Sequence, residues 1–217
     1  MVLAIFDLDN TLLNGDSDHA WGEFICDKAY VDARQYRQRN DDFYEDYTRG
    51  ALDIYAYQRF ALEPLKGRTA SELQRWHDEF MAERISSMVL PKAQALINKH
   101  RQAGDYLLII TATNRFITGP IARLLGVDHL IATEPEMKDG VYTGEVEGMP
   151  CYQHGKIERL NHWLQSRTDN LTGSFFYSDS HNDLPLLTIV DHPVAVDPDE
   201  QLQEYALEHG WPIISLR

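Results

Sequence analysis

The chain opens with a short apolar run that ends on two aspartates, MVLAIFDLDNT. The run from Val2 to Leu8 is rich in strand-forming residues and is too short for a typical helix, which predicts a buried strand. Side chains at i and i+2 of an extended segment point to the same side. Asp7 and Asp9 are therefore expected to address one point just beyond the carboxyl end of this strand.

Apolar runs of the same kind recur along the chain and alternate with helical patterns. Further strands are predicted at Tyr106–Ile110, Ser174–Tyr177 and Pro193–Val196, and helices at about 91–103, 116–125 and 156–164. Such alternation predicts an α/β fold, a Rossmann-like parallel sheet sandwiched by helices. The Asp139-Gly140 pair also predicts a small hairpin around residues 138–142.

Residues 16–87 interrupt this alternation, because they contain no convincing strand. Thr69 and Glu72 form a capping-box pattern at the start of one helix, and Asp53 is placed to cap another. We interpret the aromatic stripes of these helices as core; they comprise Leu73, Trp76, Phe80 and Met81 in the first helix and Ile54, Tyr57 and Phe60 in the second. We therefore expect a discontinuous core, residues 1–15 and 88–217, with an inserted all-helical cap, residues 16–87.

The chain is strongly acidic: 20 Lys and Arg face 34 Asp and Glu among 217 residues, a formal net charge of -14. Such a surface repels nucleic acids and anionic membranes, which argues against both as partners. Asp7 breaks the N-terminal apolar run, which also lacks a basic start, so we expect no signal peptide and a cytoplasmic protein. We interpret Cys26 and Cys151 as reduced thiols. A monomer or a homodimer is expected.

Polar residues that suit phosphate chemistry follow the predicted strands. Asp7 and Asp9 repel one another unless a cation lies between them or one is protonated, and both arrangements suit a nucleophile next to a general acid. Thr111-Ala112-Thr113 offers a hydroxyl and backbone N–H groups to phosphate oxygens. Lys156 opens a helix as a point charge for a phosphoryl group. The carboxylates of Asp179 and Asp183 follow a third strand and are ligands of the kind that Mg²⁺ prefers.

The order DxDNT, T-A-T, K and D-x-x-x-D resembles the haloacid dehalogenase superfamily, in the branch with a helical cap after the first strand. Phosphoserine phosphatases and histidinol-phosphate phosphatases belong to this branch. The resemblance implies a phosphatase that uses Mg²⁺ and hydrolyses a small phosphomonoester through an aspartyl-phosphate. Two positions depart from the phosphoserine enzymes: Ser178 stands where they carry glycine, and Thr111-Ala112-Thr113 stands where they carry Ser-Gly-Gly.

Carried over by position, the resemblance assigns a role to each motif. It implies that Asp7 is the nucleophile and Asp9 the general acid and base. The implied metal ligands are the Asp7 carboxylate, the Asp9 backbone carbonyl and Asp179, with Asp183 supporting the water shell of the metal or Lys156. The implied phosphate ligands are Thr111, the backbone of Ala112 and Thr113, Lys156 and Asn182.

The substrate is a separate question. The cap-entrance residues Asp16 and Asp18 are acidic, whereas the place of the carboxylate-binding arginine of the phosphoserine enzymes falls at Ala61. This favours an amine-bearing substrate without a carboxylate, such as the amino-alcohol ester histidinol phosphate, and suggests a role in amino-acid biosynthesis. Asp16 is equally well explained as a helix N-cap. The alternatives are a phosphoserine phosphatase and a non-enzymatic phospho-accepting signalling domain.

Overall fold

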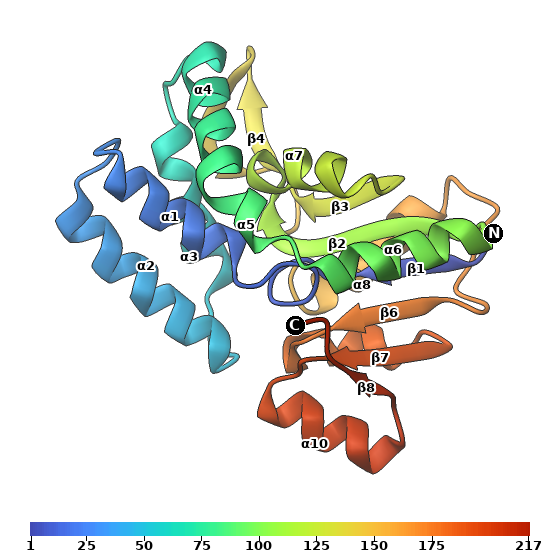
Figure 1. Ribbon diagram of the computed structural model, residues 1–217. Helices are drawn as coiled ribbons and strands as arrows, with labels where there is room; N and C mark the ends of the chain where they lie inside the picture. The colour runs from blue at the N-terminus through green and yellow to red at the C-terminus, as the bar shows by residue number, and fades with distance from the viewer.

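A six-stranded, entirely parallel sheet forms the centre of the computed structural model, which describes residues 1–217 (Figure 1). The strand order is β3-β2-β1-β6-β7-β8. The strands are β1 (Leu3–Phe6), β2 (Tyr106–Asn114), β3 (His129–Thr133), β6 (Phe175–Ser178), β7 (His192–Val196) and β8 (Ile213–Ile214). Phe6 is level with Ile109 of β2 and Tyr177 of β6. The motif residues that follow these three strands therefore emerge side by side at one edge of the sheet.

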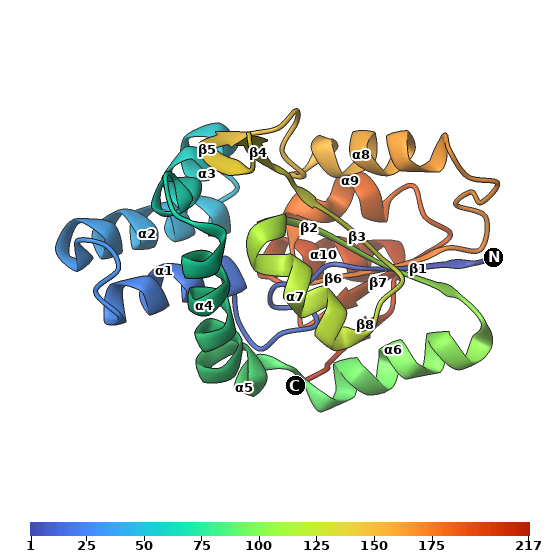
Figure 2. The ribbon, with the colours of Figure 1, turned by 90° about the horizontal axis from the view of Figure 1, so that it is seen from above.

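Helices cover both faces of the sheet (Figure 2). One face carries α6 (Pro91–Ala103) and α7 (Arg115–Leu125); the other carries α8 (His154–Leu164), α9 (Leu184–Leu187) and α10 (Glu200–His209). Alternate residues of β1 serve the two faces: Ala4 and Phe6 belong to the core under α6 and α7, and Leu3 and Ile5 to the core under the other three helices. Burial on both faces explains why β1 is apolar without alternation.

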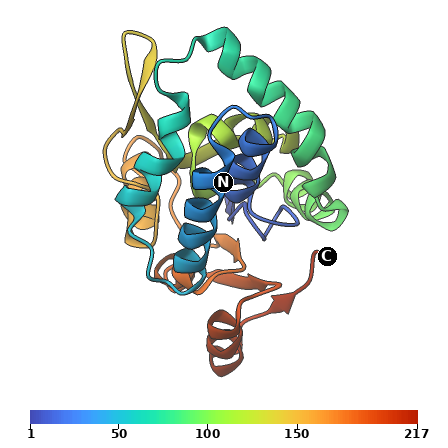
Figure 3. The same cartoon turned by 90° about the vertical axis from the view of Figure 1, so that its left-hand side faces the viewer.

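A helical insertion lies between β1 and α6, beyond the carboxyl ends of the strands (Figure 1; viewed from its own side in Figure 3). It consists of α1 (Ser17–Asp27), α2 (Ala33–Thr48), α3 (Ile54–Leu62), a 3₁₀ turn (Glu63–Leu65), α4 (Ala70–Phe80), a π-helical turn (Met81–Ile85) and α5 (Ser86–Met88). The chain leaves and re-enters the core along one antiparallel bridge between Leu13 and Val89. This bridge fixes the base of the insertion against the loop that carries the two aspartates.

The α/β fold class is confirmed, as are the predicted strands and helices of the core. The hairpin is also present, formed by β4 (Pro135–Lys138) and β5 (Val141–Val146), with positive φ angles at Asp139 and Gly140. Asp53 caps α3, and Thr69 caps α4 through a complete capping box. β3, β8, α2 and α10 were not predicted. Both cysteines are free and buried, and no helix is long and apolar enough to cross a membrane.

The start of α8 tolerates no side chain at Gly155. A Cβ there would lie 2.1 Å from the Pro150 carbonyl oxygen, so the backbone before Lys156 would have to move. We expect Gly155→Ala to lower the free energy of unfolding by about 1–3 kcal/mol, the usual cost of overpacking. Urea unfolding would measure it.

Gly119→Ala is the matched control, because the atom nearest to a Cβ at this helical position belongs to Arg123 and lies 3.7 Å away, an ordinary contact. This change should raise stability by roughly 0.5–1 kcal/mol through helix propensity. Equal effects of the two substitutions would contradict the close approach at Gly155.

Candidate active site

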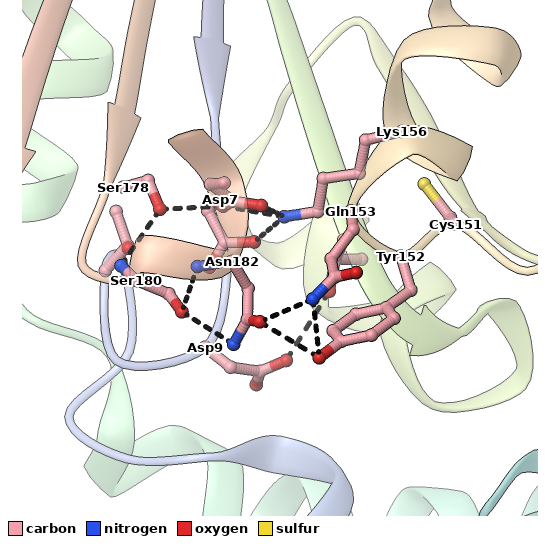
Figure 4. A network of polar contacts seen from close by, with 12 residues as sticks. Asp7, Asp9, Cys151, Tyr152, Gln153, Lys156, Ser178, Ser180 and Asn182 are labelled. Carbon is pink, nitrogen blue, oxygen red and sulfur yellow. Dashed lines mark hydrogen bonds and ion pairs between the residues drawn. The ribbon is translucent and has the colours of Figure 1, made fainter. Parts of the chain in front are cut away.

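The buried Lys156 contacts Asp7 at the centre of the sheet edge (Figure 4). It also contacts Asp183. The Lys156 Nζ donates to Asp7 Oδ1 at 2.7 Å and lies 2.7 and 2.8 Å from the two carboxylate oxygens of Asp183. Asp7 follows β1, Lys156 lies in the first turn of α8 and Asp183 follows β6. Each of the three side chains is at least 93% shielded from solvent. Three segments that are far apart in sequence are thus held by one ammonium group.

The electrostatics of this cluster are set by burial and by an excess of carboxylates. Burial raises the pKa of the Asp7 carboxyl to about 7; Lys156 opposes this increase, and Asp183 and Asp9 add to it. Burial alone would lower the pKa of the Lys156 ammonium, but Asp183 and Asp7 outweigh it and the pKa is raised. Lys156 therefore stays positively charged.

Asp9 faces the threonines at the carboxyl end of β2. Thr113 Oγ1 donates to Asp9 Oδ2 at 2.8 Å, Thr111 Oγ1 lies 3.5 Å from the same oxygen, and the backbone N–H of Ser17 donates to Asp9 Oδ1 at 2.7 Å. Burial raises the pKa of Asp9 to about 7, Asp16 adds to the increase, and the hydrogen bonds from Ser17 and Thr113 oppose it. A carboxyl group with this pKa can both release and accept a proton near neutral pH.

Asp179 is held by Thr11, a residue of the first motif to which the sequence analysis gave no role. Thr11 Oγ1 donates to Asp179 Oδ1 at 3.0 Å and accepts from the Asp179 backbone N–H at 3.1 Å. Burial, Asp7 and Asp183 raise the pKa of the Asp179 carboxyl well above its usual range, and Thr11 opposes them. Ser178, which stands where the phosphoserine enzymes carry glycine, donates to Asp183 Oδ2 at 2.7 Å. This hydrogen bond holds the carboxylate that pairs with Lys156.

The donor set fits a hard divalent cation. Asp7, Asp9, Asp179 and Asp183 place four carboxylates beside one ammonium. Burial, with repulsion from neighbouring aspartates, raises the pKa of Asp7 and of Asp179, and a bound cation would lower both. No three His, Cys, Asp or Glu side chains are arranged to chelate a metal. Mg²⁺ does not need such a group, since it is commonly bound through one or two carboxylates plus water and substrate oxygens.

Asn182 bridges the loop after β6 and the segment before α8 (Figure 4). Its Oδ1 accepts from the Tyr152 hydroxyl at 3.0 Å and from Gln153 Nε2 at 2.9 Å. Its Nδ2 donates to Ser180 Oγ at 3.2 Å and to the Tyr47 carbonyl of α2 at 3.3 Å. Asn182 therefore connects the core with the helical insertion.

A cavity extends from Asp7 and Asp9 into the helical insertion. The core contributes Asp7, Asp9, Thr111, Ala112 and Thr113 to its wall; the insertion contributes Asp16, Asp18, His19, Asn40, Phe43, Tyr44, Tyr47, Leu52, Ile54, Tyr57 and Gln58. Its lining contains acidic and aromatic side chains and no lysine or arginine. A wider groove between α4, α7 and the β4–β5 hairpin contains none of the motif aspartates.

Comparisons with known proteins agree with this geometry. The family model of haloacid dehalogenase-like hydrolases matches residues 4–188. A histidinol-phosphatase of Neisseria meningitidis is 47% identical over 99% of both chains. The chain belongs to the haloacid dehalogenase-like hydrolases.

Other proteins similar to this hydrolase carry different names and have lower sequence identity to it. The phosphoserine phosphatase SerB1 of Mycobacterium tuberculosis is 32% identical over 99% of this chain and 70% of its own. A Bordetella pertussis structure is 44% identical with a TM-score of 0.93, covering 99% of this chain and 98% of its own. A substrate-bound phosphoserine phosphatase shares the fold at 18% identity and a TM-score of 0.72, over 100% and 93% of the two chains. The prediction of a phosphatase of this superfamily is confirmed, and the signalling-domain alternative has no support.

The motif residues lie together at one edge of the sheet, whereas Asp16 and Asp18 line the cavity from the insertion. The N-cap role weighed for Asp16 is present. Asp16 is the N-cap of α1, with Oδ1 accepting from the backbone N–H groups of Asp18 and His19 at 2.8 Å each. The interpretation of the two stripes as core holds for Leu73, Trp76, Phe80 and Phe60, which are buried. It was wrong for Ile54 and Tyr57, which line the cavity. Their spacing fits both roles, since a helix face looks the same whether it covers a core or a ligand.

Two polar residues of the cavity lack part of their hydrogen bonding. Asp18 Oδ2 and Gln58 Oε1 are buried without a partner. Burial, followed by Asp16, raises the pKa of the Asp18 carboxyl well above its usual range. The Nε2 of Gln58 donates to the Ala112 carbonyl at 3.2 Å, so its unpaired oxygen lies beside the predicted phosphate-binding turn. Sequence analysis missed Gln58, because glutamine in a helix is usually exposed.

The raised pKa values of Asp7 and Asp9 predict how stability depends on pH when divalent metal is chelated. Each group has an ordinary pKa of 3.8 and a folded-state pKa of about 7, so the folded state binds more protons between these values. The stabilisation is complete below the ordinary pKa and is lost as the pH rises through about 7. We expect urea unfolding in EDTA to show lower stability at about pH 8 than at about pH 5.

Asp9→Asn should reduce this slope, because an amide in that position does not titrate. The difference between wild type and variant also removes the contributions of histidines that titrate in the same range. A change in stability between about pH 5 and about pH 8 that is the same in wild type and variant would contradict the assignment.

Proposed function

We propose that this hydrolase is a Mg²⁺-dependent phosphatase that forms an aspartyl-phosphate on Asp7 and acts on an amino-alcohol phosphate of the histidinol phosphate type. The observation that carries the proposal is the buried arrangement of Asp7, Lys156 and Asp183, with Asp9 held beside it by Thr113. A carboxylate next to a fixed cation suits attack on an anionic phosphorus centre, and a second carboxyl group with a pKa near 7 suits proton transfer.

The first half of the reaction transfers the phosphoryl group to the enzyme. Lys156 offsets the negative charge of the phosphate, so that an Asp7 oxygen approaches phosphorus in line with the leaving oxygen. As the Asp7–phosphorus bond forms, the bond to the ester oxygen breaks and that oxygen takes the proton of Asp9. The alcohol leaves neutral, and Asp9 remains as a carboxylate held by the Thr113 hydroxyl.

The second half releases phosphate. The Asp9 carboxylate takes a proton from a water molecule, whose oxygen attacks the phosphorus of the aspartyl-phosphate. The bond to Asp7 breaks, inorganic phosphate forms and Asp9 is protonated again. Residues that hold the phosphoryl oxygens throughout are expected to be Thr111, the backbone N–H groups of Ala112 and Thr113, Lys156 and Asn182.

The proposed metal would be held by the Asp7 carboxylate, the Asp9 backbone carbonyl and Asp179, with Asp183 supporting its water shell. When bound, Mg²⁺ supplies charge that stabilises the phosphoryl oxygens in the transition state. Thr11 holds Asp179 on this side of the cluster, and Ser178 holds Asp183. Lys156, bound to Asp7 Oδ1, supplies a further positive charge.

Residues 16–87 are proposed to act as a cap over the core formed by residues 1–15 and 88–217. The cavity is lined by residues of both parts, among them Asp7 and Asp9 of the core and Tyr57 of the insertion. Helices that cover the reacting groups exclude bulk water, which strengthens the electrostatic interactions inside. The contact between Asn182 and the Tyr47 carbonyl is one direct link between cap and core.

The cavity lining is the evidence for an amine-bearing substrate. Asp18 is a buried carboxylate with an unpaired oxygen, and such a group is strongly stabilised by a cationic partner. Aromatic rings such as Tyr57 and Tyr47 also favour a cation. No lysine or arginine of the lining would pair with a substrate carboxylate. The Neisseria relative named histidinol-phosphatase supports this choice over phosphoserine.

Two substitutions test the catalytic roles. Asp7→Asn should abolish turnover of p-nitrophenyl phosphate in Mg²⁺ while the circular-dichroism spectrum stays unchanged, because an amide is a very poor nucleophile. Asp9→Asn should lower kcat by at least about 10²-fold, as expected for the loss of a general acid and base, and accumulate phospho-enzyme that intact-protein mass spectrometry detects. Wild-type turnover should stop in EDTA and return with Mg²⁺. Full activity of either variant would refute its assigned role.

Asp18→Asn tests the substrate. We expect kcat/KM for histidinol phosphate to fall about 10- to 100-fold, because a hydrogen bond to a charged group is worth about 1.5–3 kcal/mol, while p-nitrophenyl phosphate is unaffected. Asp42→Asn, the same change at an exposed position of α2 outside the cavity, serves as the control. A wild-type preference for phosphoserine over histidinol phosphate would rule out the amine-without-carboxylate substrate but not the phosphatase.

A further inference from the structure

Gln153 adopts a backbone conformation that L-residues rarely take. Its φ of 48° and ψ of −118° lie outside the left-handed helical region as well as the right-handed one. The backbone N–H of Gly155 donates to the Tyr152 carbonyl at 2.8 Å, which closes a tight turn with Gln153 as its second residue. In a turn with these angles that position favours glycine. A glutamine here is therefore strained, whereas glycine would not be.

The side chain of Gln153 fixes the orientation of the Asn182 amide (Figure 4). Gln153 Nε2 donates to Asn182 Oδ1 at 2.9 Å, and the Tyr152 hydroxyl donates to the same oxygen at 3.0 Å. With both donors on the carbonyl end, the NH₂ end of Asn182 points to the other side, where it meets Ser180 and Tyr47. A flipped amide would place its NH₂ group against two donors.

The same turn also sets the position of Lys156. Gln153 binds Asn182, and Lys156, three residues later, binds the next residue, Asp183. The turn is rigid because Gly155 packs against the Pro150 carbonyl with no room for a Cβ. Two contacts therefore join the start of α8 to the loop after β6.

We propose that Gln153 is a positioning residue: it holds the NH₂ group of Asn182 and the ammonium group of Lys156 in register for a phosphoryl group. This inference rests on the proposed function, because it assumes that Asn182 and Lys156 bind phosphate. Gln153 itself acts only through them. The strain persists because glycine would relax the turn but supply no amide.

Gln153→Gly and Gln153→Ala form the deciding pair. Both remove the amide, so in both the inhibition constant of inorganic phosphate and the KM for p-nitrophenyl phosphate should rise roughly tenfold with little change in kcat, the pattern of lost uniform binding. Only glycine relieves the backbone strain, so Gln153→Gly should unfold at a higher urea concentration than Gln153→Ala. A merely structural role predicts instead that phosphate binding recovers together with stability in Gln153→Gly.

Asp139→Gly is the control for strain relief, because Asp139 also has a positive φ, 52°, but lies in the turn of the β4–β5 hairpin. It should leave the inhibition constant of phosphate unchanged. Wild-type phosphate inhibition in both Gln153 variants, with turnover intact, would overturn the inference alone. A wild-type enzyme that hydrolyses no phosphomonoester in Mg²⁺ would overturn the proposed function and the inference with it.

Discussion

The site depends on one buried ammonium group. Lys156 lies between Asp7 and Asp183, and burying an unpaired charge at this depth would be prohibitively costly. The pair of contacts fixes the end of β1, the start of α8 and the loop after β6 in one place. Because Asp179 and Asp9 add two further carboxylates nearby, the cluster keeps an excess of negative charge. The divalent cation proposed above would offset this excess.

The parallel sheet makes this concentration of charge possible. Neighbouring parallel strands end at the same edge, and β2, β1 and β6 are adjacent at the middle of the sheet, where helices cover both faces. The carboxyl ends of these strands therefore lie side by side between the two helical layers. Thr111 and Thr113 reach Asp9 from β2, and Thr11 reaches Asp179 from the loop after β1. Asp9 and Asp179 are each held by a hydroxyl group from a different segment.

The core and its motifs were predictable from sequence because each strand is an apolar run that ends abruptly on polar residues. Prediction failed where that contrast is weak. α2 consists mostly of polar and charged residues and has only Asn40 buried. β8 has two residues and depends on pairing with β7. The contact between Asp9 and Thr113 joins residues 104 positions apart. The local sequence pattern predicted that Asp9 and Thr113 each lie near the end of a strand. Their contact follows from the adjacency of β1 and β2 in the sheet.

Residues facing the cavity from the insertion are harder to find in sequence than the motif residues. Gln58 is fully buried, yet it sits between Tyr57, which lines the cavity, and Arg59, which is exposed, so no periodic pattern marks it. Its two polar ends have separate uses: Nε2 holds the Ala112 carbonyl of the core, and Oε1 is left without a partner. Gln58 thus ties α3 to the turn after Thr111 and leaves a free acceptor in the cavity. The cavity lining therefore depends on how the helices of the insertion pack on the core as well as on which residues they carry.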